Sequence, residues 1–259
     1  MPHISFSELK EWNLCPFRHK VQYIDKNRIF EGNIYTAFGT ALHTICEGIT
    51  TKQYNTLEEQ KRQFKIAFTE QVINLPESEH ERLNEELIAE FEQQGLQLVS
   101  KILPALQEKF GNFTVVSVEE RLYEPLEEYE GWKFKGFIDL VLKTEDEKYH
   151  VIDWKSCSWG WDAERRSDKI TGYQPTLYKK FWCDKHGVDP KDVEIYFALL
   201  KRTATKNRVE IFRVTSGPRK IKNALNLLNA AVYNITKKNH IKNRLNCGKC
   251  SLHKTKLCP

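Results

Sequence analysis

The chain has 259 residues, and its 40% of hydrophobic residues is enough to build the core of one large domain that folds alone. No run of about 18 apolar residues occurs, and residues 1–10 carry charges, so we expect neither a membrane span nor a signal peptide but a cytoplasmic protein of a bacterium or a phage-infected cell. The formal net charge of +5, from 40 basic and 35 acidic residues, permits a polyanionic partner without requiring one.

Helices are expected at the start of the chain. Ser5 or Ser7 can cap a first helix, which should end at Cys15-Pro16 because proline does not continue a helix. A second helix is expected to begin near Tyr35, since apolar residues then recur at spacings near three and four.

The composition and the hydrophobic pattern of the sequence change near residue 110. Residues 56–110 are polar, have recurring apolar positions and lack strand signals, which predicts more helix, interrupted at Pro76. The next part is rich in β-branched residues that alternate with polar ones, which predicts strands. Three consecutive strands, expected to form a meander, cover residues 114–123, 132–143 and 149–154.

The remaining elements alternate between helix and strand. Helices fit residues 171–186 and 218–237, and strands fit residues 193–200 and 208–214. The fold class is therefore α/β, with a mixed central sheet and an N-terminal helical elaboration over residues 35–110.

Two aspartates mark the ends of neighbouring predicted strands. Asp139 follows Gly136-Phe137-Ile138, and Asp153 follows Val151-Ile152. Two carboxylates at neighbouring strand ends can hold a hard divalent cation through oxygen ligands. Lys155 returns to the face of Asp153 and can stabilise charge on a phosphoryl group. The alternative is that these residues are a turn former and a solvated lysine.

Polar residues on two predicted helices can join this site. His43 lies four residues after Gly39, and its imidazole suits a manganese ion as readily as core packing. Gln174 and Tyr178 share one helix face and can orient Lys155 or contact a phosphate, or else be ordinary exposed helix residues.

In chain order, four motifs resemble the motif set of RecB-type PD-(D/E)XK nucleases: Gly39-x-x-x-His43, Gly136-x-x-Asp139, Asp153-x-Lys155 and Gln174-x-x-x-Tyr178. The resemblance covers most of the chain and implies a single restriction-endonuclease-like domain over residues 1–259 that cuts DNA with Mg²⁺ or Mn²⁺. It implies three side chains as metal ligands, His43, Asp139 and Asp153, assisted by the backbone carbonyl of Trp154. It also implies Asp139, Asp153, Lys155, Gln174 and Tyr178 as the catalytic residues.

The family often carries a further glutamate on the strand before the second motif. Glu119 and Glu120 are adjacent, and neighbours in a strand face opposite ways, so only one of them can face the metals. Glu47, one helical turn after His43, is a third candidate. The sequence does not choose among them.

Four cysteines bracket the nuclease motifs: Cys15 near one end, and Cys247, Cys250 and Cys258 near the other. Four thiolates suit zinc or an iron-sulfur cluster equally well, His253 can replace one thiol at a zinc site, and unliganded thiols are a further alternative. The pattern is similar to that of AddB-type and CRISPR-associated adaptation nucleases, which implies a 4Fe-4S cluster that closes residues 245–259 onto Cys15. The remaining cysteines, Cys46, Cys157 and Cys183, are expected to be packing residues.

The expected function is a metal-dependent DNA exonuclease acting on single strands or DNA ends in recombination, repair or phage DNA processing. The alternatives are a structure-specific endonuclease and a catalytically idle iron-sulfur subunit that binds nucleic acid. Basic residues are dense between Lys201 and Lys256 and can either bind DNA or form a solvated surface. Four aromatic residues near the second aspartate can stack on single-stranded bases or belong to the core, namely Trp154, Trp159, Trp161 and Tyr173.

Overall fold

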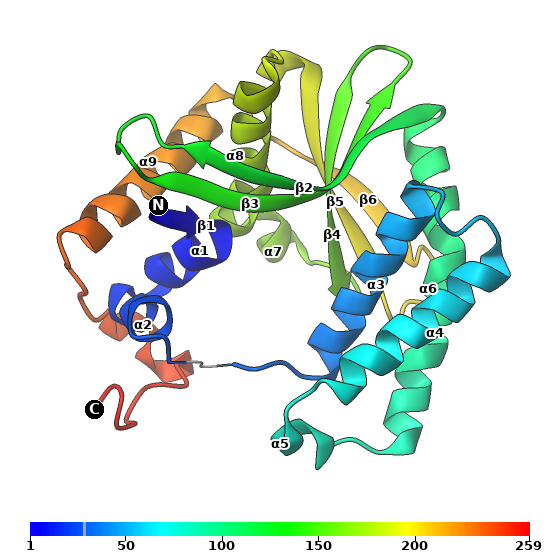
Figure 1. The fold of residues 1–259 in the computed structure, drawn as a ribbon, viewed down its shortest axis with the longest axis horizontal. Helices are drawn as coiled ribbons and strands as arrows, with labels where there is room; N and C mark the ends of the chain where they lie inside the picture. The colour runs from blue at the N-terminus through cyan, green and yellow to red at the C-terminus, as the bar shows by residue number, and fades with distance from the viewer. Residues whose placement is uncertain (28–29) are drawn as a thin grey trace. The chain divides into compact units, whose positions relative to one another are not determined.

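The structure is a computed structural model that describes residues 1–27 and 30–259 (Figure 1). The chain divides into two compact units, each assembled from separate stretches of sequence. The first unit comprises Met1–Glu31, Arg121–Gly136 and Gly217–Pro259, and the second comprises Gly32–Glu120 and Phe137–Ser216. The boundaries between the units fall inside two long strands, β2 (Phe113–Pro125) and β3 (Lys133–Thr144), so each of these strands has residues in both units. The single-domain organisation expected from the sequence stays a prediction.

The second unit contains a mixed sheet, which confirms the predicted α/β fold class. In this sheet β3 pairs antiparallel with β4 (Tyr149–Cys157), β4 pairs parallel with β5 (Val193–Lys201), and β5 pairs antiparallel with β6 (Val209–Val214). β2 pairs with β3, so β2, β3 and β4 form the predicted meander. Most residues of the middle strands β4 and β5 are buried, because both faces of these strands are covered.

A helix connects the two parallel strands, as parallel pairing requires. This helix, α8 (Lys169–His186), follows the short helix α7 (Ala163–Ser167) and packs against β4 and β5. Asp168 caps α8 by accepting a hydrogen bond from Thr171 N at 2.6 Å. Gly187 ends it with a left-handed φ of 65°, a conformation that costs glycine little. The predicted helix was therefore correct to within two residues at its start.

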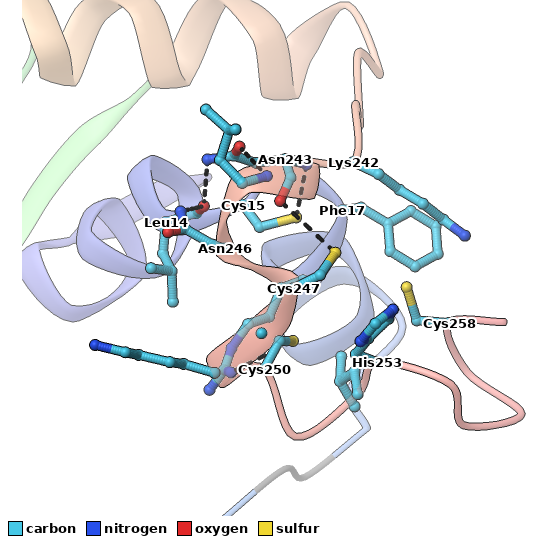
Figure 2. A pocket seen from close by; sticks show the side chains of 15 residues that line it. Leu14, Cys15, Phe17, Lys242, Asn243, Asn246, Cys247, Cys250, His253 and Cys258 are labelled. Atoms are coloured by element: carbon cyan, nitrogen blue, oxygen red, sulfur yellow. Dashed lines mark hydrogen bonds between the residues drawn. The ribbon is translucent and has the colours of Figure 1, made fainter.

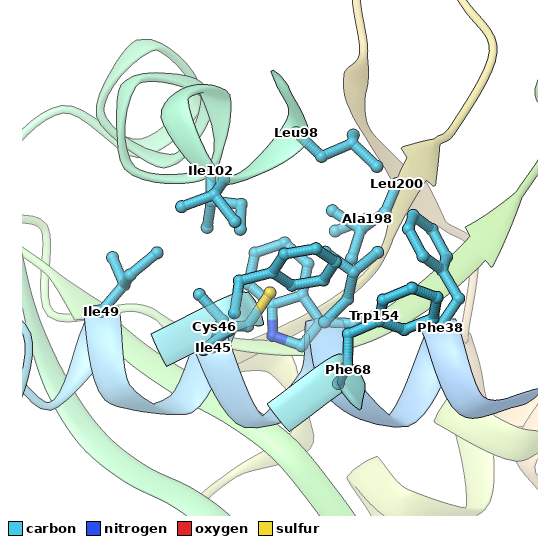
Figure 3. Close-up of a cluster of buried hydrophobic side chains, with 14 of the residues drawn as sticks. Phe38, Ile45, Cys46, Ile49, Phe68, Leu98, Ile102, Trp154, Ala198 and Leu200 are labelled. Atoms are coloured by element: carbon cyan, nitrogen blue, oxygen red, sulfur yellow. The ribbon is translucent and has the colours of Figure 1, made fainter. Parts of the chain in front are cut away.

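The other helices of this unit build a large apolar cluster (Figure 3). They are α3 (Ile34–Thr50), α4 (Leu57–Ile73) and α6 (Glu85–Phe110). The short helix α5 (Glu77–His80) lies between α4 and α6 along the chain and has no buried residue, and Pro76 lies at the predicted interruption. The cluster combines aromatic rings of these helices, such as Phe38 and Phe68, with Trp154 of β4 and Leu200 of β5. α6 has 26 residues, yet among the described residues no helix is apolar enough over sufficient length to cross a membrane.

The first unit brings the beginning and the end of the chain into contact. Residues His3–Ser5 form β1, a strand not expected from the sequence, which pairs parallel with Lys133–Lys135. Ser5 then caps α1 (Phe6–Leu14), as predicted, by accepting a hydrogen bond from Glu8 N at 3.2 Å. α1 contacts α9 (Pro218–Thr236), and α2 (Pro16–His19) follows directly.

Gly95 of α6 leaves room for the ring of Phe64 on α4. A Cβ atom built at Gly95 would lie 2.0 Å from Cζ of Phe64, whose ring is fully buried. We expect Gly95→Ala to lower the free energy of unfolding by about 1–3 kcal/mol, because the added methyl overpacks this contact. Urea denaturation measures the change, with Gln97→Ala, exposed on the same helix, as the control. Equal stability of the two variants would contradict this account of the helix packing.

Candidate active site

Three side chains from three different elements converge in the second unit. His43 lies on α3, Glu119 on β2 and Asp139 on β3, and one ligand atom from each lies within 4.8 Å of the others. An imidazole nitrogen and two carboxylate oxygens at these separations can share one divalent cation such as Mg²⁺ or Mn²⁺. The structure thus brings together two sequence-predicted ligands and one of the three candidate glutamates.

The position of Asp139 follows from the way β3 and β4 part. Their paired residues end at Leu140 and Ile152. Beyond this point the backbone N–H of Trp154 donates to Oδ2 of Asp139 at 2.7 Å, instead of to a backbone carbonyl of β3. The second oxygen, Oδ1, lies 3.5 Å from Nδ1 of His43. Burial alone would lower the pKa of His43, but this ion pair raises it.

Asp153 and Lys155 form an ion pair on β4, where alternate residues share a face. Oδ2 of Asp153 is 2.5 Å from Nζ of Lys155. The aspartate is almost fully buried, and its pKa is raised to about 6. Burial is the largest cause and the negative charge of Asp139 adds to it, although Lys155 favours the charged form. Asp153 is therefore electrostatically part of the same site as the three converging side chains.

The two adjacent glutamates of β2 have different surroundings. Glu120 accepts hydrogen bonds from Nε1 of Trp182 at 2.9 Å and from Nζ of Lys185 at 2.6 Å, and such bonds lower its pKa to about 2 despite partial burial. Glu119 has a left-handed φ of 48°, which interrupts the extended strand. Burial, and then Asp139, raise the pKa of Glu119. Glu47 is not in the converging group. The sequence could not choose Glu119 over Glu120, because the hydrogen-bond partners of Glu120 lie on α8, which is remote along the chain.

Gly39 explains how α3 comes close enough to present His43. A Cβ atom built at Gly39 would lie 2.9 Å from Oγ of Ser156 on β4. A side chain at this crossing would therefore have to displace the Ser156 hydroxyl. His43 follows one helical turn later and reaches Asp139.

Gln174 and Tyr178 also lie beside the site. Nε2 of Gln174 donates to the hydroxyl of Tyr178 at 3.2 Å, and Tyr178 is buried. Burial raises the pKa of Tyr178, and the charge of Asp153 raises it further. Tyr178 also has a hydrogen bond with the backbone of Phe137 on β3. The two residues are thus not ordinary exposed helix residues, and Tyr178 lies close enough to Asp153 to respond to its charge.

The structure separates the aromatic residues for which the sequence left open either stacking on DNA or packing in the core. Trp154 and Trp161 are 2% and 6% exposed, so both are core residues and neither can stack on bases. Trp154 packs in the helical cluster (Figure 3), and Trp161 packs against Phe197. Trp159 is 75% exposed, and Tyr173 is half-buried. Spacing could not predict this difference, since neighbouring tryptophans have identical propensities.

Two residues of the basic stretch are not on the surface. Lys201 and Arg202 are each 8% exposed. Nζ of Lys201 donates to Glu210 at 3.1 Å, and the Arg202 guanidinium lies 4.1 Å from the centre of the Phe91 ring. The interpretation of the whole stretch as an exposed surface is therefore wrong for its first two residues, whose charges are compensated inside the fold.

A second cluster of reactive side chains lies in the first unit (Figure 2). The predicted cysteines Cys15, Cys247, Cys250 and Cys258 are free thiols, and all four line one cavity of about 400 Å³ together with His253. The backbone N–H of Asn243 donates to Sγ of Cys15 at 3.3 Å, and Arg18 donates to Sγ of Cys250 at 3.8 Å. Cys46 and Cys183 are buried and Cys157 is half-buried, all away from this cavity, as expected of packing residues.

Comparisons with known proteins agree with this geometry at the level of the family. A sequence model described as the PD-(D/E)XK nuclease superfamily matches residues 3–258. No curated protein matches the chain. Among solved structures the chain is similar to SSO0001, with 12% sequence identity over 93% of this chain and 96% of that chain, and a TM-score of 0.38.

The contact between Gly39 and Ser156 is testable by a double-mutant cycle. Gly39→Ala should destabilise the protein less in a Ser156→Ala background than in the wild type, because the clash involves Oγ, whereas Cβ of Ser156 lies at an ordinary 3.8 Å. We expect a coupling free energy of about 1 kcal/mol from urea denaturation of the four proteins. Additive effects of the two substitutions would show that this contact does not limit the approach of α3 to β4.

Proposed function

The chain belongs to the PD-(D/E)XK nuclease superfamily, and on this premise we propose that it hydrolyses DNA phosphodiester bonds at the site built around Asp139, Asp153 and Lys155. The observation that carries the proposal is the convergence of His43, Glu119 and Asp139 beside the Asp153–Lys155 pair. Nucleases of the PD-(D/E)XK superfamily use divalent metals, and the converging acidic group supplies ligands of the required kind.

The electrostatics of the site suit a divalent cation. Burial and mutual repulsion raise the pKa of both Glu119 and Asp153, so the site holds more negative charge than its own basic groups compensate. We propose His43, Glu119, Asp139 and Asp153 as ligands of one or two Mg²⁺ or Mn²⁺ ions, with the Trp154 carbonyl assisting. When bound, the cation supplies a Lewis acid for the phosphoryl oxygens and lowers the pKa of water.

The remaining residues have roles that follow from their contacts. Lys155 is held by Asp153 on the active-site face, where its ammonium can stabilise the negative charge that develops on the phosphoryl group. Gln174 and Tyr178 position the site, since Gln174 holds the Tyr178 hydroxyl and Tyr178 contacts the backbone of β3. These three residues therefore orient and stabilise, while the acidic group binds the cation.

For the mode of action we propose an exonuclease that acts on single strands or DNA ends in recombination, repair or phage DNA processing. The resemblance to RecB-type nucleases supports this proposal, and so does an exposed tryptophan just beyond β4. A structure-specific endonuclease would use the same catalytic residues. A catalytically idle subunit would have no need for the ion-paired Lys155 beside the converging acidic group.

We further propose that Cys15, Cys247, Cys250 and Cys258 hold a 4Fe-4S cluster, with zinc as the alternative. Four free thiols that line one cavity provide the complete ligand set for either group. Asn243 and Arg18 donate hydrogen bonds to two of the sulfurs, and such outer contacts orient the ligand atoms of a metal centre. A bound cluster would supply a covalent connection between the beginning and the end of the chain.

The first test is the degradation of end-labelled single-stranded DNA, linear and circular, with Mg²⁺ or Mn²⁺. We expect loss of the linear substrate alone, and a decrease in kcat of about 100- to 1,000-fold in Lys155→Ala, as when an electrostatic stabiliser of the transition state is removed. Lys143→Ala is the matched control, since Lys143 is also an ion-paired strand lysine with a similar side-chain exposure of 28% against 30%. Cleavage of circles would establish an endonuclease, and absence of metal-dependent cleavage would refute the catalytic proposal.

The cofactor proposal predicts a brown protein after anaerobic purification, with about four iron and four sulfide ions per chain. Cys250→Ser should lower the iron content and visible absorbance, whereas Cys157→Ser, a half-buried cysteine that does not line the cavity, should leave both unchanged. A colourless protein with one bound zinc ion, measured by elemental analysis, would replace the cluster with the zinc alternative.

A further inference from the structure

Phe137 is an exposed aromatic residue in the immediate neighbourhood of the active site. It is 44% exposed, while its strand neighbours Phe134 and Ile138 are completely buried. Phe137 precedes Asp139 by two residues on β3, so the two side chains share a face, and their Cα atoms are about 7 Å apart at the rise of an extended strand. A DNA strand whose phosphate lies at Asp139 therefore has a base within reach of the Phe137 ring.

The backbone of Phe137 is held in place by the residues that position the active site. Tyr178 has a hydrogen bond with this backbone, and Gln174 donates to the Tyr178 hydroxyl at 3.2 Å. Tyr178 is buried, so the contact is shielded from water. The phenylalanine ring is thus presented from a fixed strand position, and little conformational entropy is lost when it contacts a ligand.

The surroundings of Phe137 select the part of a nucleotide that it can contact. The acidic group around Asp139 repels phosphate unless a cation is bound, although Lys155 supplies a positive charge beside Asp153. A phenylalanine has no hydrogen-bond donor or charge for a phosphate, but its ring can stack on a base of any identity. In duplex DNA the bases are already stacked on their neighbours, so only an unpaired or extruded base offers a free face.

We propose that Phe137 stacks on an unpaired base next to the phosphate to be cut and so makes single-stranded DNA the preferred substrate. The inference rests on the proposed nuclease function and specifies its substrate. Stacking on one base corresponds to roughly a 5- to 150-fold contribution to affinity. Because a ring face is required, an apolar side chain of similar size without a ring cannot replace it.

The test measures binding separately from cleavage. Fluorescence anisotropy of a labelled oligothymidine is recorded in Ca²⁺ with proteins that carry Lys155→Ala, which keeps the DNA intact. Phe137→Leu should weaken binding about tenfold, Phe137→Trp should retain it, and Tyr233→Ala, which removes a 49% exposed aromatic side chain of the first unit, should leave it unchanged. Oligonucleotides with one abasic site, placed at each position in turn, should reveal one position where Phe137→Leu has no further effect.

The outcomes separate the two proposals. Equal binding by Phe137→Leu and its parent, or the same loss with every abasic oligonucleotide, overturns the stacking inference even if the wild-type enzyme degrades DNA. Weaker oligothymidine binding in Trp159→Ala but not in Phe137→Leu overturns it in favour of the other exposed aromatic residue. Weakened binding in Phe137→Leu with the expected abasic position upholds the stacking contact, even if wild type shows no cleavage and the nuclease proposal fails. Circular dichroism of Phe137→Leu confirms that the variant is folded.

Discussion

The end of pairing between β3 and β4 is the constraint on which the candidate active site depends. After Leu140 and Ile152 the two strands no longer share backbone hydrogen bonds, and the Trp154 N–H would be left without its partner on β3. The Asp139 carboxylate takes this place at 2.7 Å. A buried N–H without an acceptor is costly, so the hydrogen bond fixes both the point where the strands part and the orientation of the carboxylate. One oxygen of Asp139 remains available to His43 and to a cation.

The packing on either side of β4 serves the same arrangement. The Trp154 side chain is buried in the helical cluster, which anchors the backbone that donates to Asp139 (Figure 3). Gly39 allows α3 to approach Ser156, and this approach brings His43 to the parted strands. On the other side α8 supplies Tyr178 and removes Glu120 from the site through Trp182 and Lys185. The residue types of the motifs thus reflect packing requirements as much as chemistry.

The sequence predicted those features that depend on local patterns. Periodicity located the long helices and the later strands, and strand alternation placed Asp153 and Lys155 on one face. The sequence did not predict β1, because a three-residue strand has too few positions for a periodic signal.

The remaining differences depend on tertiary contacts. Glu119 could not be chosen over Glu120, since the choice depends on a left-handed φ in β2 and on partners from α8. Burial also distinguishes Trp154 from Trp159, and it places Lys201 and Arg202 inside the fold, where contacts from other elements decide the outcome.

The two proposed metal sites make different demands on folding. The ligands in the second unit come from elements with their own extensive core, so that site is shaped before any cation binds. The cysteine cavity instead joins Cys15 to residues more than two hundred positions later along the chain, in a unit made of three separate stretches. Bringing together residues so far apart in the chain costs conformational entropy, and coordination by four thiolates would offset this cost within the first unit. A cluster there would therefore contribute mainly to folding, whereas a cation at Asp139 would contribute to chemistry.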